Sequence, residues 1–234
     1  MAALAVIFRP AVDISLNILM IIAISYLIFT VGLVVSYKAY EIGPISLTSP
    51  IVGAFSIIVV ASSVLFLDAS LQAIQWIGLL LLFTGLFMAS MQKNKSQSWR
   101  SSGIALAFIA LIFMGVGLSG YVYAIGKIGW FYTVLLGYFF TAFWSAMFLI
   151  YKKEFKAFTL PKSTIGLVIF QIIGTLSVSI GVERSLSVII VPVSSLSPLA
   201  TSLLGVLIYK EAVTRQRLYA VLIIIISLVL VSYN

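Results

Sequence analysis

Apolar segments long enough to cross a membrane follow one another along almost the whole of this 234-residue chain. We recognise eight of them, at residues 11–37, 43–67, 71–91, 103–126, 130–151, 165–181, 188–209 and 218–232. Because a helix rises about 1.5 Å per residue, about 20 apolar residues cross the ~30 Å hydrocarbon core of a bilayer. Lipid offers the backbone no hydrogen bonds, and segments of this length satisfy their own as helices rather than as barrel strands. The sequence therefore predicts an all-α polytopic membrane protein with about eight transmembrane helices.

The composition agrees with this class of protein and excludes several kinds of chemistry. Hydrophobic residues make up 62% of the chain and charged residues 9%, whereas roughly a quarter of the residues in a soluble domain are charged. The chain has no cysteine and no histidine. This excludes disulfides, metal or haem sites built from those residues, and Ser-His catalysis. We therefore expect neither an enzyme nor a cofactor.

The acidic side chains lie near the ends of the apolar segments or in the loops between them. They are Asp13, Glu41, Asp68, Glu154, Glu183 and Glu211. Solvation or a neighbouring base is the expected environment for such residues. The sequence thus lacks the mid-membrane carboxylate that proton-coupled transporters commonly use.

The basic residues explain the net charge of +8 by topology rather than by nucleic-acid binding. With eight spans, one side of the membrane collects eleven of the fourteen basic residues: Lys38, Lys93, Lys95, Arg100, Lys152, Lys153, Lys156, Lys162, Lys210, Arg215 and Arg217. The positive-inside rule makes this side cytoplasmic. Loops 92–102 and 152–163 are therefore predicted to be cytoplasmic in a protein of the cell membrane, with both termini outside.

Two similar proline-containing runs indicate an internal repeat. The run PISLTSP at 44–50 and the run PVSSLSP at 192–198 align with a shift of 148 residues. Residues 75–78 (QWIG) correspond to 217–220 (RLYA) with a shift of 142 residues, so the first copy has six extra residues between the two matches. A unit of five helices would insert its second copy upside down, which is the inverted-repeat plan of many secondary transporters. We predict a partial first repeat of three helices at 1–91 and a full second repeat at 102–234. The first copy then lacks two helices, either because the reading frame is truncated or because eight helices are the real product.

The inner prolines of the two runs predict kinked helices that meet at a central cavity. Pro44 and Pro192 suit the first turn of a helix, whereas Pro50 and Pro198 each remove an interior hydrogen bond. In lipid the freed carbonyl must face protein or a watery cavity, and inverted-repeat transporters bind their substrate between the repeats. The predicted cavity residues in these runs are Ser46, Ser49, Pro50, Ser194, Ser195, Ser197 and Pro198. The alternative is a pair of packing kinks in which small serines let helices approach.

Three further residues are predicted to line the cavity. Tyr138 and Trp144 place a hydroxyl and an indole N–H near the middle of an aromatic-rich segment, where both need partners. Gln171 is an amide well inside the sixth segment and also needs a partner, water or a ligand. Simple packing is the alternative for all three. Tyr121 and Tyr123, late in their segment, are expected to be interfacial anchors.

Taken in order, these motifs resemble those of a known transporter superfamily. A polar turn (Tyr40-Glu41 or Arg184-Ser185) precedes the Ser-Pro run, and an acidic turn (Asp68 or Lys210-Glu211) follows a long apolar run. With the QWIG sequence this order resembles the EamA-type drug/metabolite transporter superfamily. The resemblance implies ten helices in two inverted five-helix repeats and the export or exchange of small metabolites or drugs. Two of those helices are missing here, and the charge bias differs from the cytoplasmic termini that the family implies.

The sequence therefore predicts a secondary membrane transporter of small organic metabolites or drugs that works by alternating access. The expected partners are the lipid bilayer, a small-molecule substrate, and a second copy or a helper subunit, without nucleic acid. The alternative is a non-transporting integral membrane subunit that pairs with a helper chain supplying the missing helices.

Overall fold

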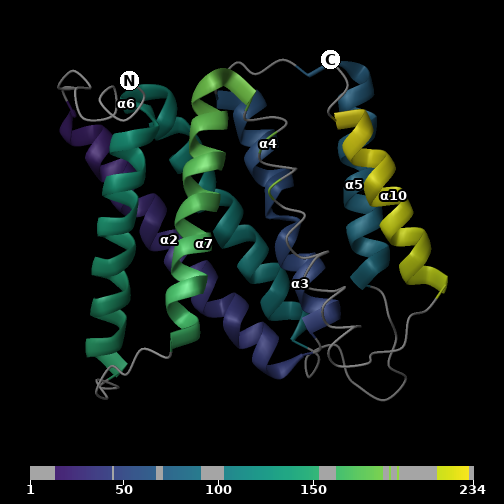
Figure 1. Cartoon of the computed structure of the whole chain (residues 1–234), viewed down its shortest axis with the longest axis horizontal. Helices are drawn as coiled ribbons and strands as arrows, with labels where there is room; N and C mark the ends of the chain where they lie inside the picture. The colour runs from purple at the N-terminus through teal and green to yellow at the C-terminus, as the bar shows by residue number, and fades with distance from the viewer. Residues whose placement is uncertain are drawn as a thin grey trace.

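The computed structural model describes residues 14–43, 45–66, 71–90, 103–152, 162–186, 190, 194 and 215–231. The predicted segment 188–209 lies almost wholly outside the described residues, as do the loop 92–102 and most of the loop 152–163. In the described part of the chain every regular element is a helix, so the all-α prediction is confirmed (Figure 1). The elements are α2 (Leu16–Ile42), α3 (Ile45–Gly53), α4 (Phe55–Phe66), α5 (Ala73–Ser90), α6 (Ile104–Lys152), α7 (Lys162–Gly181), the π-helical turn η1 (Val182–Leu186) and α10 (Arg215–Val231).

Two of these helices, α2 and α6, are long and apolar enough to cross a membrane. Only 22% of the most apolar part of α2 and 33% of that of α6 are buried inside the protein. The core helix of a soluble protein buries most of its surface, so this exposure is unusual for such a helix. Both helices have the length, composition and exposure expected of a lipid-facing span.

Helix α2 begins and ends five residues later than the predicted segment 11–37. Ser15 caps its start, because the Ser15 hydroxyl accepts a hydrogen bond from the Ile18 N–H at 3.4 Å. The helix continues past residue 37, and Lys38 and Glu41 form a 2.9 Å ion pair on the exposed side of its last turns. A charge that finds a partner on the helix surface does not terminate the helix.

The predicted segment 43–67 is divided at Ala54 into α3 and α4. At the division, hydrogen bonds run from the Ala54 N–H to Ile51 O and from the Ile57 N–H to Ala54 O, both at 3.1 Å and both across three residues. These tighter turns replace the usual four-residue spacing. The interruption was expected at the Ser46–Pro50 turn, but it lies four residues after Pro50, and α3 is continuous through the proline.

The predicted segments 103–126 and 130–151 are the two halves of α6, joined at one residue rather than by a loop. Gly129 has φ 79° and ψ 165°, which is a conformation almost confined to glycine. The chain reverses there, so the second half of α6 descends beside the first, at one edge of the molecule (Figure 1). The remaining predicted helices match α5, α7 and α10 within three residues at each end.

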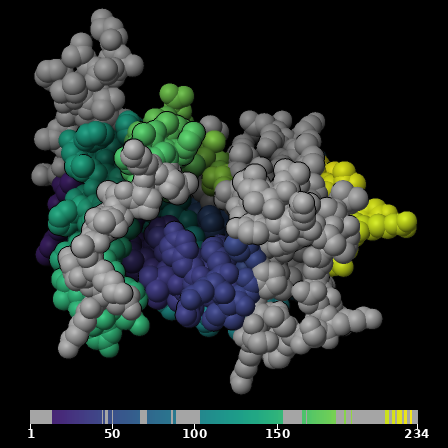
Figure 2. Space-filling model, turned by 60° about the horizontal axis from the view of Figure 1, so that its bottom comes forward, coloured from purple at the N-terminus to yellow at the C-terminus, as the bar shows by residue number. Residues whose placement is uncertain are grey.

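Figure 1 shows the first half of α6 crossing α2, and α4 packs on the same half of α6. Helices α5 and α10 lie side by side at the opposite end of the molecule from the second half of α6 (Figure 1). Figure 2 shows α10, in yellow, at one edge of the molecule. Ala54, at the break between α3 and α4, packs with Leu82 of α5 and Ile224 of α10.

Candidate functional site

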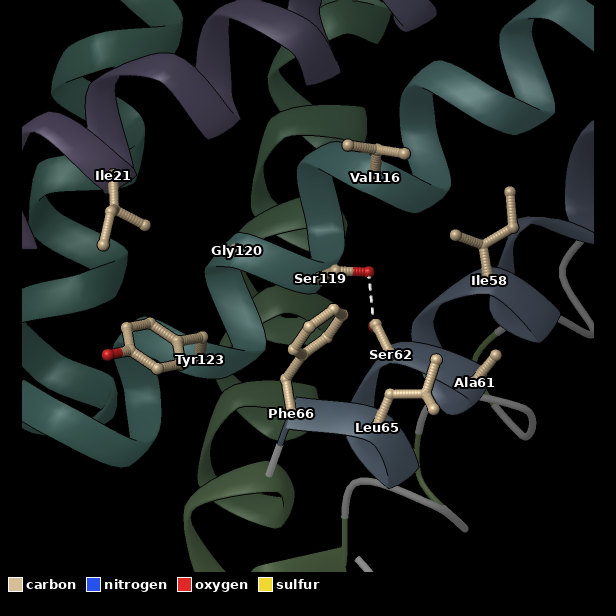
Figure 3. A pocket seen from close by; sticks show the side chains of 10 residues that line it. All are labelled: Ile21, Ile58, Ala61, Ser62, Leu65, Phe66, Val116, Ser119, Gly120 and Tyr123. Carbon is tan, nitrogen blue, oxygen red and sulfur yellow. Dashed lines mark hydrogen bonds between the residues drawn. The ribbon is translucent and has the colours of Figure 1, made fainter. Parts of the chain in front are cut away.

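A pocket of about 530 Å³ lies between α2, α4 and α6 (Figure 3). It is called the α4–α6 pocket below. It is lined by Ile21 of α2, by Ile58, Ala61, Ser62, Leu65 and Phe66 of α4, and by Val116, Ser119, Gly120 and Tyr123 of α6. On each helix these positions recur every three or four residues and so share one face. No charged side chain is among them, and the walls are mostly aliphatic and aromatic.

The two serines of the pocket are bonded to each other across the helices. The hydroxyls of Ser62 and Ser119 lie 2.6 Å apart, and Figure 3 shows them pointing toward one another. Ser119 donates to Gly115 O at 2.8 Å, and Ser62 lies 2.8 Å from Val59 O. The two hydroxyl protons have three acceptors nearby, namely Ser119 Oγ, Gly115 O and Val59 O. Both protons are therefore used in hydrogen bonds inside the protein. The pair links α4 to α6 and leaves the pocket without an unpaired donor from either serine.

The opposite face of α3 and α4 is buried and carries three serines spaced seven residues apart. Ser49 hydrogen-bonds with the Tyr40 hydroxyl, and Ser63 donates to Val59 O at 2.8 Å. Ser56 is 1% exposed, and within the described part of the chain its hydroxyl has no hydrogen-bond partner. A buried hydroxyl without a partner is uncommon in proteins. This face, and not the pocket, holds the sequence-predicted Ser49.

Four of the predicted cavity residues in the two proline runs belong to the described part of the chain. Ser49 is buried, and Ser46 and Pro50 belong to α3, although their side chains lie outside the described part. In the second run Ser194 is half-buried. Ser195, Ser197 and Pro198 lie outside the described residues, so the meeting of the two runs remains a prediction.

The other three predicted cavity residues lie apart from the α4–α6 pocket. Trp144 donates its indole N–H to Ala23 O at 3.0 Å and thereby joins the second half of α6 to α2. Tyr138 is 41% exposed on the same half of α6, and Gln171 is exposed in the middle of α7. The structure therefore brings none of these three to the pocket.

Sequence reasoning missed the residues that do line the pocket. Ser62, Ser119 and Tyr123 stand in the runs VVASSVLF and GVGLSGYVY, where hydroxyls at helical spacing interrupt apolar residues. Such hydroxyls are a signal for interhelical hydrogen bonds. The signal names no partner, however, because the 57-residue separation of Ser62 and Ser119 is closed only by the fold.

The expectation that Tyr121 is an interfacial anchor is wrong. Its side chain is buried, and its hydroxyl hydrogen-bonds with Ser179 of α7. Its ring meets Tyr26 of α2 edge to face, with centroids 6.1 Å apart. Tyr121 therefore links three helices in the core, and only its neighbour Tyr123 faces the pocket.

An acidic side chain caps the second half of α6 at its turn. The Trp130 N–H donates to Glu183 Oε1 at 3.2 Å, and Glu183 belongs to η1. The Gly129 turn leaves the first N–H groups of the following helix without helical partners, and a carboxylate is a favourable acceptor there. Glu183 thus holds η1 against the turn of α6.

Helices α5 and α10 pack antiparallel. Gln216, in the first turn of α10, donates to Met88 O near the end of α5 at 3.1 Å. Further along, a Cβ added at Gly85 would lie 2.7 Å from Ile224 Cγ1 and 3.2 Å from Ala220 O, so only glycine allows this approach. Leu82 of α5 packs with Ile224 of α10 in the same seam, and Gly78 of α5 and Ser227 of α10 are also buried.

The chain matches no protein-family model, and no curated protein matches it significantly. The function therefore has to be argued from the chain's own residues.

Proposed function

We propose that this protein is a secondary membrane transporter of small organic solutes, working by the rocking of two inverted repeats. The observation that carries the proposal is the seam between α5 and α10. The sequence alignment pairs Gly78 with Ala220, and the same shift of 142 residues pairs Leu82 with Ile224 and Gly85 with Ser227. All six of these residues are buried, and the printed contacts across the seam join Gly85 to Ala220 and Ile224 and group Leu82 with Ile224.

Such a seam is what equivalent helices of inverted repeats would form. A two-fold axis in the membrane plane reverses the direction of each helix, so two equivalent helices next to the axis run antiparallel and present the same positions to each other. The antiparallel contacts of α5 with α10 and the shared cluster of Leu82 and Ile224 agree with this arrangement. Ala54 packs on the same seam, so the break between α3 and α4 lies beside the proposed axis.

Exposure of large apolar side chains supports the membrane location that the proposal needs. Leu80 of α5, Phe139 of α6 and Phe170 of α7 are each more than 60% exposed, on three different helices. In water, apolar exposure around the whole bundle would be strongly unfavourable, whereas in lipid it costs nothing. Transmembrane orientation, with loops 92–102 and 152–163 in the cytoplasm, is part of the proposal.

A reversible cross-link between the repeats tests the transport mechanism. Ser62 and Ser119 belong to different repeats, and their hydroxyl oxygens are 2.6 Å apart, so cysteines there can form a disulfide with little backbone movement. The natural chain has no cysteine to interfere. We expect proteoliposomes with the double variant Ser62→Cys/Ser119→Cys to lose efflux of ethidium or of radiolabelled tryptophan on oxidation and to regain it with dithiothreitol.

The single variants Ser62→Cys and Ser119→Cys are the matched controls and should keep their flux under oxidation. Flux that persists in the cross-linked double variant would contradict rocking between the repeats. Absence of flux above protein-free liposomes for both probes in the unmodified protein would favour the second candidate function.

That second candidate is a membrane subunit that works with another chain, and the outer face of α7 favours it. Gln171 is exposed in the middle of this apolar helix, beside the exposed side chains of Phe170 and Ile173. An amide at mid-membrane is stabilised by a hydrogen bond from a neighbouring helix. If a subunit role is correct, the protein purified in mild detergent has a particle mass above its own 25.5 kDa, and Gln171→Leu reduces that mass.

A further inference from the structure

We infer that the α4–α6 pocket binds an acyl chain of a membrane lipid that has an anionic headgroup, and that Lys127 stabilises that headgroup. The inference goes beyond transport: it requires the chain to lie in a membrane, but it does not require the chain to move a solute. Four observations support it: the pocket's walls, its hydroxyls, its opening and the charge beside it.

The walls of the pocket are suited to hydrocarbon. Ile58, Leu65 and Phe66 come from α4, Val116 and Gly120 from α6, and Ile21 from α2. A volume of about 530 Å³ lies within the range of roughly 300–1,000 Å³ that is usual for small-molecule sites. A methylene group that moves from the bilayer core to such walls exchanges one apolar environment for another, so an acyl chain enters without a desolvation cost.

The two serine hydroxyls of the pocket do not favour a polar occupant. The protons of Ser62 and Ser119 are both used between the two serines and the helix carbonyls. A polar solute entering the pocket would lose its hydrogen bonds to water and find no free serine donor to replace them. A hydrocarbon chain has no hydrogen bonds to lose, so the pocket favours a hydrocarbon chain over a polar solute.

The opening of the pocket faces outward from the bundle. Leu65 is 73% exposed and Phe66 is 76% exposed at the end of α4, and Val116 is partly exposed on α6. In a membrane these side chains contact lipid tails, so an acyl chain can enter sideways from the bilayer without crossing a polar barrier.

A positive charge lies on the pocket face of α6, one turn beyond the pocket. Val116, Gly120, Tyr123 and Lys127 follow one another at intervals of three or four residues and share that face. Lys127 Nζ lies 5.6 Å from the centroid of the Tyr123 ring, and Tyr123 is itself a pocket wall. The next residues are the Gly129 turn, so Lys127 lies at a helix end, where a lysine can extend to the lipid headgroups.

Lys127 has no acidic partner among the residues that line the pocket. None of the lining residues is acidic. The carboxylate of Glu183, near this turn of α6, accepts a hydrogen bond from the Trp130 N–H. An apolar slot with an ammonium group at its interfacial end is complementary to a lipid with one acyl chain in the slot and a phosphate beside the lysine.

Native mass spectrometry of the detergent-purified protein tests the inference. The probes are phosphatidylglycerol and phosphatidylcholine with identical acyl chains, added over a range of concentrations. We expect the unmodified protein to retain phosphatidylglycerol in preference, and Lys127→Gln to reduce that preference roughly fivefold, the worth of one basic residue near an anionic lipid. The matched control is Lys152→Gln: Lys152 lies 5.9 Å from the Phe148 ring at the other end of α6, away from the pocket.

A second pair of variants tests the slot itself. Val116→Trp extends a large side chain from an exposed position into the pocket and should abolish retention of both lipids. Leu135→Trp introduces the same side chain at another exposed position of α6 and should leave retention unchanged. Equal thermal unfolding midpoints for the two variants establish that loss of lipid is not loss of fold. Ala61→Phe, which fills the pocket from the α4 wall, should also abolish retention of both lipids.

The other outcomes would overturn the inference. Equal retention of the two lipids by the unmodified protein would exclude headgroup selection by Lys127. Unchanged retention in both Val116→Trp and Ala61→Phe would exclude the pocket as the site. Stronger binding of free palmitate than of phosphatidylglycerol would identify a soluble amphiphile as the occupant in place of a membrane lipid.

Discussion

At the level of single residues, the turn of α6 depends on two residues, Gly129 and Glu183, that lie far apart in the chain. Gly129 supplies the backbone conformation, and Glu183 supplies the acceptor for the Trp130 N–H. The glycine is recognisable in the sequence as a candidate turn between two apolar segments. The acid is not, because its position at the end of the sixth segment is equally explained by solvation.

Replacing Glu183 by alanine should lower stability. Loss of a helix-capping acceptor costs about 1 kcal/mol, in the range of about 0.5–2 kcal/mol. The control Glu41→Ala removes an acid from an exposed ion pair with Lys38 and should change stability by less than about 0.5 kcal/mol. The measurement is denaturant unfolding of both variants in one detergent, and equal changes would show that the Trp130 cap contributes nothing.

At the level of whole elements, the pairing of α5 with α10 is decided by a few small residues. Gly85 allows Ala220 and Ile224 to approach, and the buried neighbours Gly78 and Ser227 are also small. Lipid gives helices little hydrophobic reason to associate, so close backbone contact at such residues is the main source of their affinity. The two helices are consecutive neither in sequence nor in the sequence-based list of segments.

Substitution of Gly85 by leucine should therefore separate these helices. The new side chain would overlap Ile224, and overpacking of this kind costs about 1–3 kcal/mol. Gly166→Leu is the matched control, because no atom lies within 4 Å of a Cβ added at Gly166. Thermal unfolding and limited proteolysis of the two variants give the comparison. A Gly85→Leu protein as stable as the Gly166→Leu protein would contradict the seam.

At the scale of the whole molecule, an inverted repeat requires α5 and α10 to enter the membrane from opposite sides. Single cysteines in place of Gln72 and Arg215 lie just before or at the start of these helices. In intact cells an impermeant maleimide should label position 72, predicted outside, and leave position 215 unlabelled until the membrane is permeabilised. Labelling of both positions in intact cells would contradict the antiparallel insertion and the repeat with it.

Helix positions follow closely from the sequence, and helix partners do not. Apolar length located α5, α7 and α10 to within three residues, because lipid-exposed helices are defined by their own composition. The end of α2 and the break at Ala54 differ from the predicted positions. The Lys38–Glu41 ion pair lies in the last turns of α2, and Ala54 packs on two other helices. The ion pair is a local contact, whereas the packing of Ala54 joins residues far apart in the sequence, and local composition does not contain it.

The sequence by itself determined that the chain is helical, apolar throughout its segments and devoid of cysteine and histidine chemistry. It determined this because each of these properties depends on residues taken alone or on neighbours within a few turns. Only the tertiary structure decided that Ser62 meets Ser119, that Tyr121 is buried against Ser179 and that Trp144 is bonded to Ala23 O. In an apolar chain almost any face can pack on almost any other, so such long-range pairs are selected by the fit of glycines and hydroxyls in three dimensions.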